Sequence, residues 1–282
     1  MSKSMNRFLT NDVVLLAPRG CCASRNFNSF KPNSIDYSGL LEQAQMLRGS
    51  VYSRDGAIQP SQLQIDGRYI MEDDREYWHL LLLNQQSAVC GCARFRLHST
   101  SVRFDQLALR HCPLVSDNGV DSDFRIKVEE QISAAQIAGL SYLEFGGWAL
   151  GEEARNTSAV LKCILGIYAW SQLIGGCLGI CSATVRHGSA SILRRVGGIP
   201  FSIGPRKHCT YYDSTYQCEM QVLGFDSRYP ATRYASLVEV MRQELISVPV
   251  FEREYPASNK AHFEVDPSWT LPQVFSGSPV PN

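Results

Sequence analysis

The chain has 282 residues and a formal net charge of zero, because 27 lysines and arginines balance 27 aspartates and glutamates. This balance argues against a dedicated nucleic-acid-binding protein, which usually carries a basic excess. With 44% hydrophobic residues, the chain can bury a substantial core. No early run resembles a signal peptide and no segment is apolar enough to span a bilayer, so we expect a cytoplasmic protein without a membrane span.

The 10 cysteines lie largely in apolar surroundings. Cys90 and Cys92 stand too close together for the usual spacing of zinc ligands, and no matched second pair exists. We therefore predict buried free thiols in a reducing compartment, and no metal site.

In chain order, residues 1–35 are rich in Ser, Asn and Arg and show no sustained periodicity, which predicts a partly ordered N-terminal arm. The spacing of apolar residues predicts a helix over 37–50. A polar loop with an acidic cluster follows. Two apolar runs at 78–84 and 87–98, joined by a short polar turn, then predict a β-hairpin.

After an irregular stretch at 99–123, helices and strands alternate. The predicted helices cover 124–140, 159–173, 189–196 and 229–248. The predicted strands cover 141–150, 179–185 and two segments within 209–225. This order predicts an α/β (α+β) fold, a mixed sheet with helices on both faces. No linker interrupts residues 36–248, so we predict one domain there and a Pro- and Ser-containing tail at 249–282.

The turn at 151–158, GEEARNTS, connects a predicted strand to a predicted helix. A helix N-terminus leaves backbone N–H groups free and carries a partial positive charge. Together with the short polar side chains and Arg155, this favours a site for a pyrophosphate or a phosphopantetheine.

Four segments in the right order resemble the GCN5-related N-acyltransferase (GNAT) superfamily, nearest to its branch of autoinducer synthases and long-chain N-acyl amino acid synthases. They are residues 47–52 (LRGSVY), the acidic loop 66–74, the strand GCARFRL at 91–97 and the strand YLEF at 142–145. The resemblance covers roughly residues 38–248 and implies a splayed sheet that holds an acyl thioester.

The resemblance also implies where an acyl donor binds. The thioester carbonyl would meet backbone N–H groups near Ala149 and Leu150, and the phosphate would meet the turn, through Arg155, Asn156, Thr157 and Ser158. The donor would be an acyl-phosphopantetheine co-substrate, carried by acyl carrier protein or coenzyme A, and no cofactor would be bound permanently.

Three departures from the family pattern qualify this reading. Gly147 stands where autoinducer synthases have an arginine, which weakens a homoserine-lactone product. The turn lacks the family's glycines and approaches a phosphate less closely, which favours the single phosphate of acyl carrier protein. Arg194 stands near the position of the tyrosine that serves many members as general acid.

Glu144 and Arg94 are the predicted catalytic residues. Glu144 could be a general base, an anchor for the substrate amine or part of a structural ion pair. Arg94 could pair with Glu144, bind a substrate carboxylate or form a salt bridge on the strand face. The predicted substrate-binding residues are Arg48, which could instead pair with the acidic loop, Asp73 and Trp148.

The first hypothesis is an N-acyltransferase that moves a fatty acyl group from acyl carrier protein or acyl-CoA to the amine of an amino acid or similar small acceptor. An acyl-homoserine-lactone synthase is the alternative in the same class. A non-catalytic acyl-thioester-binding module is the alternative from another class.

Overall fold

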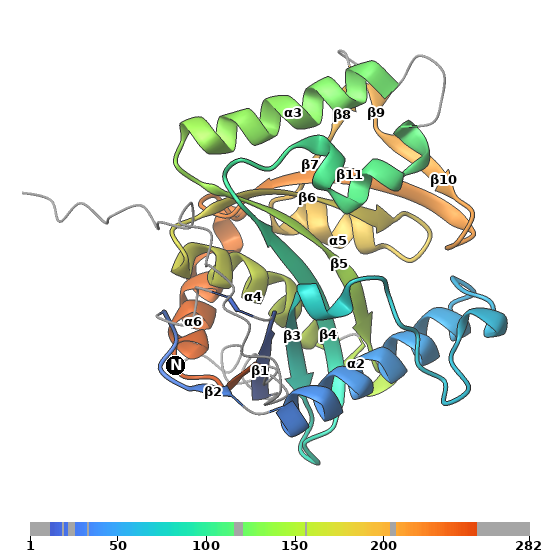
Figure 1. The fold of residues 1–282 in the computed structure, drawn as a ribbon, viewed down its shortest axis with the longest axis vertical. Helices are drawn as coiled ribbons and strands as arrows, with labels where there is room; N and C mark the ends of the chain where they lie inside the picture. Colours follow the sequence, from blue (N-terminus) through green and yellow to red (C-terminus); the bar gives the residue numbers. More distant parts are fainter. Residues whose placement is uncertain are drawn as a thin grey trace, which may run out of the picture.

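A computed structural model describes residues 12–18, 20–21, 26–32, 34–115, 121–155, 157–203 and 207–252 (Figure 1). The helices are α2 (Ser34–Arg54), α3 (Asp121–Ile137), α4 (Ala159–Leu173), α5 (Ser189–Val196) and α6 (Ala235–Leu245). The strands are β1 (Asp12–Ala17), β2 (Phe30–Pro32), β3 (Trp78–Leu83), β4 (Val89–His98), β5 (Ser141–Leu150), β6 (Cys177–Thr184), β7 (Ile199–Pro200), β8 (Ser202–Ile203), β9 (Lys207–His208), β10 (Thr210–Asp213), β11 (Cys218–Asp226) and β12 (Val250–Glu252).

One mixed sheet organises the described chain. Its order is β10-β11-β6-β5-β4-β3-β1-β12-β2, with β7 paired to β11, and β8 and β9 form a separate pair. Most neighbours are antiparallel, whereas three pairs run parallel: β5 with β6, β1 with β12, and β12 with β2. The predicted mixed α/β sheet with helices on both faces is therefore confirmed.

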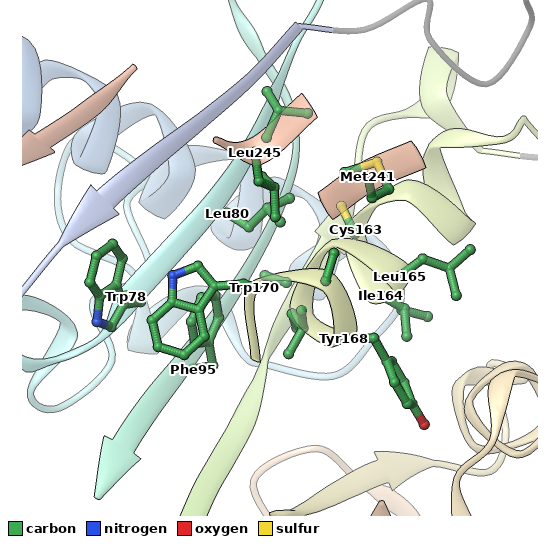
Figure 2. Close-up of a cluster of buried hydrophobic side chains, with 14 of the residues drawn as sticks. Trp78, Leu80, Phe95, Cys163, Ile164, Leu165, Tyr168, Trp170, Met241 and Leu245 are labelled. Carbon is green, nitrogen blue, oxygen red and sulfur yellow. The ribbon is translucent and has the colours of Figure 1, made fainter. Parts of the chain in front are cut away.

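The helices cover the two faces of the sheet unequally. Alternate residues of β3 show this division: Leu80 belongs to the large apolar cluster with α4, α5 and α6, whereas Leu81 packs with α2. On the α4 side, the ring of Trp170 lies 5.0 Å from that of Trp78 and 4.7 Å from that of Phe95 (Figure 2). This aromatic cluster fixes α4 against the middle of the sheet, and so fixes the turn before it.

The sheet extends beyond the predicted domain range of 36–248. The short apolar run at Asp12–Ala17 forms β1, which pairs antiparallel with β3 and parallel with β12. Residues 12–17 therefore belong to the sheet, although the sequence pattern placed them in the arm 1–35. The tail beyond Glu252 lies outside the described residues, and the three-part division of the chain stays a prediction.

Two predicted boundaries are corrected. The helix predicted over 229–248 begins at Ala235, after a short 3-10 turn at Thr232–Tyr234, so Pro230 precedes it. The described part of the irregular stretch at 99–123 contains three 3-10 turns, and α3 already begins at Asp121. Among the described helices, none has the length and apolar character to cross a membrane.

The feature that matters for a binding site is the divergence of β5 from β6. The two strands pair only from Ser141 with Cys177 to Glu144 with Ile180. Beyond Glu144, β5 stays paired with β4 as far as Leu150, while β6 stays paired with β11. The sheet thus opens between the second halves of β5 and β6, as the sequence analysis predicts.

Candidate functional site

A cavity of about 680 Å³ occupies the opening between β5 and β6. Its walls are the C-terminal halves of the two strands, the end of α2 and the first turns of α4 and α5. The 3-10 segment near Leu109 and the β10–β11 hairpin close it on the other sides. Ala149, Leu150, Trp148 and Arg155 line this cavity, so it gathers predicted donor-binding and substrate-binding residues from separate parts of the sequence.

A β-bulge shapes the β5 wall of the cavity. Cys92 pairs with Ala149 and Arg94 with Gly146, so Gly147 and Trp148 together oppose the single residue Ala93. Gly147 has φ +58°, and a Cβ atom there would lie 2.7 Å from Cγ of Arg94. A side chain at this position would therefore collide with Arg94, and the left-handed backbone also favours glycine here.

Glu144 is the last residue of β5 that pairs with β6, and both of its oxygens are engaged. The backbone N–H groups of Ala108 and Leu109 donate to Oε2 and Oε1 at 2.9 and 3.0 Å, and Nε2 of His98 lies 2.8 Å from Oε2. The side chain thus anchors the 3-10 segment Ala108–His111, which forms one wall of the cavity. Of the three readings of Glu144, this geometry favours the structural ion pair, and a role as base stays a prediction.

Arg94 does not pair with Glu144. Its Nη1 donates to Asp74 Oδ1 at 2.9 Å and to the Glu72 carbonyl at 3.1 Å, and its guanidinium lies 4.1 Å from the centre of the Tyr77 ring. The same side chain lines the cavity. Arg94 is therefore held rigidly at the wall, where it could still meet a substrate carboxylate.

Asp74 joins two buried arginines into one network. Arg48, which is fully buried, donates to the other carboxylate oxygen, Oδ2. Burial alone would raise the pKa of Asp74, but the charges of Arg48 and Arg94 outweigh it and lower that pKa. The alternative reading of Arg48, a pair with the acidic loop, is thus confirmed. Because Arg48 is buried and paired with Asp74, and is not among the residues that line the cavity, the geometry does not support its predicted substrate-binding role, which stays a prediction.

Asp73, the neighbour of Asp74, lies apart from this network. It is exposed, has a left-handed backbone with φ 57°, and is 3.9 Å from Nη1 of Arg96. It is not among the residues that line the cavity. Its predicted contact with substrate therefore has no support in the geometry.

His79 belongs to the same buried region. Its Nε2 donates to the Asp74 carbonyl at 2.7 Å. Burial and the nearby Arg48 charge lower the pKa of His79 to about 4. His79 is therefore a neutral, hydrogen-bonded histidine of the core.

The turn at 151–158 is tied to the end of α2 by Arg155. Nη2 of Arg155 lies 2.6 Å from Oδ2 of Asp55, and Arg54 also pairs with Asp55 at 3.2 Å. Arg186 adds a third guanidinium, whose Nη2 donates to the Asp55 carbonyl at 3.1 Å. These three arginines, 54, 155 and 186, form a basic rim around Asp55 at the cavity edge.

Polar side chains of the turn organise the start of α4. Thr157 Oγ1 accepts a hydrogen bond from the N–H of Ala159 at 3.1 Å and donates to the Ala154 carbonyl at 2.7 Å. Ser158 is the N-cap residue of α4. Asn156 lies outside the described residues. Lys162, in the first turn of α4, is buried and pairs with Glu244 at 2.8 Å.

Several lining residues escape sequence reasoning. They lie on the β10–β11 hairpin, the end of α2 and the loop after it: Tyr52, Tyr77, Tyr211, Asp213 and Tyr216. Tyr52 donates a hydrogen bond to the Trp148 carbonyl, in the bulge, at 3.3 Å. No spacing or motif connects these residues, because only the tertiary fold brings the hairpin to α2.

Comparison with known proteins identifies solved structures with a similar fold. No protein-family model matches the sequence, and no curated protein matches it. Two solved structures of BjaI, a CoA-dependent acyl-homoserine lactone synthase, are similar to it. The complex with MTA has a TM-score of 0.52 at 12% identity, and that with SAM and isopentyl-CoA has 0.51 at 13%. Both comparisons cover 87% of this chain and 94% of BjaI.

A more distant likeness is to FeeM, an N-acyl amino acid synthase from uncultured soil microbes. It has a TM-score of 0.45 at 11% identity, over 78% of this chain and 93% of FeeM. At such identities the likeness to BjaI establishes the fold and not the activity. The chain therefore has the GNAT-like fold of this synthase, which confirms the fold that the sequence resemblance implies.

Proposed function

We propose that the protein is an N-acyltransferase, which transfers a fatty acyl group from an acyl-phosphopantetheine thioester to the amine of an amino acid or similar small acceptor. The observation that carries the proposal is the opening of the sheet after Glu144, with a cavity of about 680 Å³ between β5 and β6. Among the described strands, none pairs with β5 on its β6 side beyond Glu144, so we expect the backbone N–H groups on that edge to be available to a carbonyl oxygen.

The proposed reaction needs alignment more than covalent chemistry. The amine nitrogen forms a bond to the thioester carbonyl carbon, the carbon–sulfur bond breaks, and the leaving thiolate takes up a proton as the amine loses one. Backbone N–H groups near Ala149 and Leu150 would stabilise the oxyanion. Holding both reactants in one cavity would supply much of the rate enhancement through proximity.

The donor is proposed to enter over the turn at 151–158. The basic rim of Arg54, Arg155 and Arg186 suits the phosphate of a pantetheine arm, and surface arginines also suit an acidic carrier protein. This arrangement favours acyl carrier protein as the donor's carrier, with acyl-CoA as the alternative.

The acceptor is proposed to bind at the other end, where Arg94 lies over Tyr77. A guanidinium held by Asp74 at a cavity wall suits a carboxylate, which favours an amino acid as acceptor. The collision of any side chain at Gly147 with Arg94 distinguishes this site from one built around the family's arginine. That difference favours an N-acyl amino acid over an acyl-homoserine lactone as product.

The test combines the purified chain with decanoyl-CoA or decanoyl-acyl carrier protein and an equimolar mixture of amino acids, with S-adenosylmethionine as a separate acceptor. Mass spectrometry identifies the products, and release of free thiol gives the rate. We expect N-decanoyl amino acids and acceptor-dependent thiol release. Decanoyl-homoserine lactone as the product would select the alternative synthase. Tight donor binding without any product would select a non-catalytic module.

A further inference from the structure

Three carboxylates line the cavity, and two of them are already engaged. Asp55 pairs with Arg155 at 2.6 Å and with Arg54 at 3.2 Å. Glu144 accepts two backbone hydrogen bonds and pairs with His98. Each oxygen of these two carboxylates therefore already has at least one partner among the described residues. The third carboxylate, that of Asp213, has partners at only one of its two oxygens among the described residues.

Asp213 ends β10 and begins the tight turn that leads into β11. Its Oδ1 accepts hydrogen bonds from the N–H groups of Thr215 and Tyr216, at 2.8 and 3.1 Å. Within residues 12–252, as far as the structure describes them, no hydrogen bond or ion pair reaches Oδ2. The turn therefore fixes the orientation of the carboxylate through one oxygen and leaves the other oxygen available at the cavity wall.

The hairpin turn is itself held across the opening of the sheet. The ring of Tyr216 meets that of Tyr52, on α2, edge to face at 5.9 Å. Tyr52 also contacts the ring of Tyr69 at 5.8 Å and donates to the Trp148 carbonyl on β5. These contacts tie the β10–β11 turn to the β5 side, so Asp213 is presented to the cavity by a rigid support.

Asp213 and Arg94 line the same cavity from opposite sides of the opening. Arg94 lies on β4, which is paired with β5, whereas Asp213 lies on β10, which belongs with β11 and β6. An anion-binding and a cation-binding group therefore converge on one space from the two arms of the splayed sheet. Among small biological amines, an amino acid carries the complementary pair of an ammonium and a carboxylate.

We propose that Asp213 binds the ammonium group of the acceptor, so that Asp213 and Arg94 together select an amino acid. Asp213 is then a specificity-determining residue supplied by the β10–β11 hairpin. The inference rests on the proposed N-acyl transfer and adds the residue that recognises the acceptor's amine.

Asp213→Asn tests this with little disturbance of the turn. The asparagine oxygen can still accept from Thr215 and Tyr216, while the charge is lost and Oδ2 becomes an amide nitrogen that repels an ammonium. With decanoyl-CoA as donor and the amino acid that the wild type uses best, we expect the acceptor KM to rise about ten- to a hundredfold. The donor KM should stay the same. The control is Glu219→Gln, an exposed residue of the same hairpin that does not line the cavity.

A second measurement separates recognition of the amine from a structural effect. Butyrate carries the carboxylate alone and n-butylamine carries the ammonium alone, and both are tested as competitive inhibitors. Asp213→Asn should weaken inhibition by butylamine and leave inhibition by butyrate unchanged. If an active wild type and the variant share one acceptor KM, or if the donor KM rises equally, the inference is overturned while N-acyl transfer stands. If the wild-type protein shows no acyl transfer at all, both the proposed function and the role of Asp213 are overturned.

Discussion

Glu144 is the residue of β5 at which its pairing with β6 ends. The contacts of its carboxylate bear on whether it is a general base or a structural anchor. A base would keep an oxygen free for the amine, whereas both oxygens here accept hydrogen bonds from the segment Ala108–His111 or contact His98. We predict that Glu144→Gln lowers the melting temperature clearly, because one backbone N–H would face the amide nitrogen at a cost of about 1–3 kcal/mol. Thermal unfolding followed by circular dichroism measures this effect. An unchanged melting temperature with a hundredfold loss of kcat would restore Glu144 as the base.

His79 gives a pH dependence of stability with a definite sign. Its pKa is about 4 in the folded chain and 6.5 as its ordinary value, so the unfolded chain binds the proton more tightly. The stabilisation is complete above pH 6.5 and is lost as the pH falls towards 4, by about 2–3 kcal/mol at pH 4.5.

Urea unfolding of the wild type and of His79→Gln at pH 7 and pH 4.5 isolates this contribution. Glutamine keeps a donor for the Asp74 carbonyl and does not titrate. The free energy of unfolding should therefore fall less for the variant than for the wild type between the two pH values. Equal losses in the two proteins would show that His79 is not the titrating group.

At the level of single residues, the sequence predicts side-chain partners that local patterns suggest. It misses partners that only the tertiary fold brings together. The pairing of Arg48 with the acidic loop is foreseeable, because one helix end and one acidic cluster adjoin. The partners of Glu144 are not, since Ala108 and Leu109 offer only backbone N–H groups from an irregular segment. The position of Asp213 depends on where the hairpin docks, which no local pattern encodes.

At the level of elements, β5 offers a direct way to fill the cavity. Gly146 lines it, and a Cβ atom built there meets no atom within 4 Å. We predict that Gly146→Leu abolishes most acyl transfer from long-chain donors, because the side chain would occupy the space between the diverging strands, and that the fold persists.

The matched control is Gly39→Leu. Gly39 is an exposed residue of α2, and a Cβ atom there also meets nothing within 4 Å. The rate of thiol release reports the activity of each variant, and the melting temperature reports whether it is folded. Full activity in folded Gly146→Leu would mean that the acyl chain does not use this cavity.

The turn at 151–158 should govern the affinity for the donor. We predict that Arg155→Ala raises the donor KM several-fold and leaves the acceptor KM unchanged, because one partly exposed charge contributes modest binding. If acyl carrier protein is the donor, the effect should grow at low salt and shrink at high salt. Arg242→Ala on α6, outside the cavity lining, is the control. A donor KM indifferent to Arg155 and to salt would argue against a carrier-protein partner.

Long periodic elements are well predicted from the sequence, and short ones are not. The predicted bounds of β5, α4 and α5 agree with the structure, because polar turns and glycines bound clear apolar patterns. By contrast, β1 is an apolar run of a few residues whose strand character depends on pairing with β3 and β12. A short run of this kind carries no periodicity that separates a strand from an extended loop.

At the scale of the whole molecule, the sheet is held as two arms that part after Glu144 and meet again at the tyrosine contact between α2 and the β10–β11 turn. The two arms bring charged groups of both signs to one cavity. The basic rim lies at one end of the cavity, and Arg94 and Asp213 lie at its walls. This arrangement accounts for a donor and an acceptor that share one space, which is the central claim of the proposed function.

The most direct test of this claim is mass spectrometry of lipid extracts from a host that expresses the chain, compared with the same host expressing Gly146→Leu. We predict new N-acyl amino acids with the wild-type chain, and their near absence with the folded variant. Identical lipid profiles in the wild-type, variant and empty-vector hosts, with the protein present and folded, would contradict it.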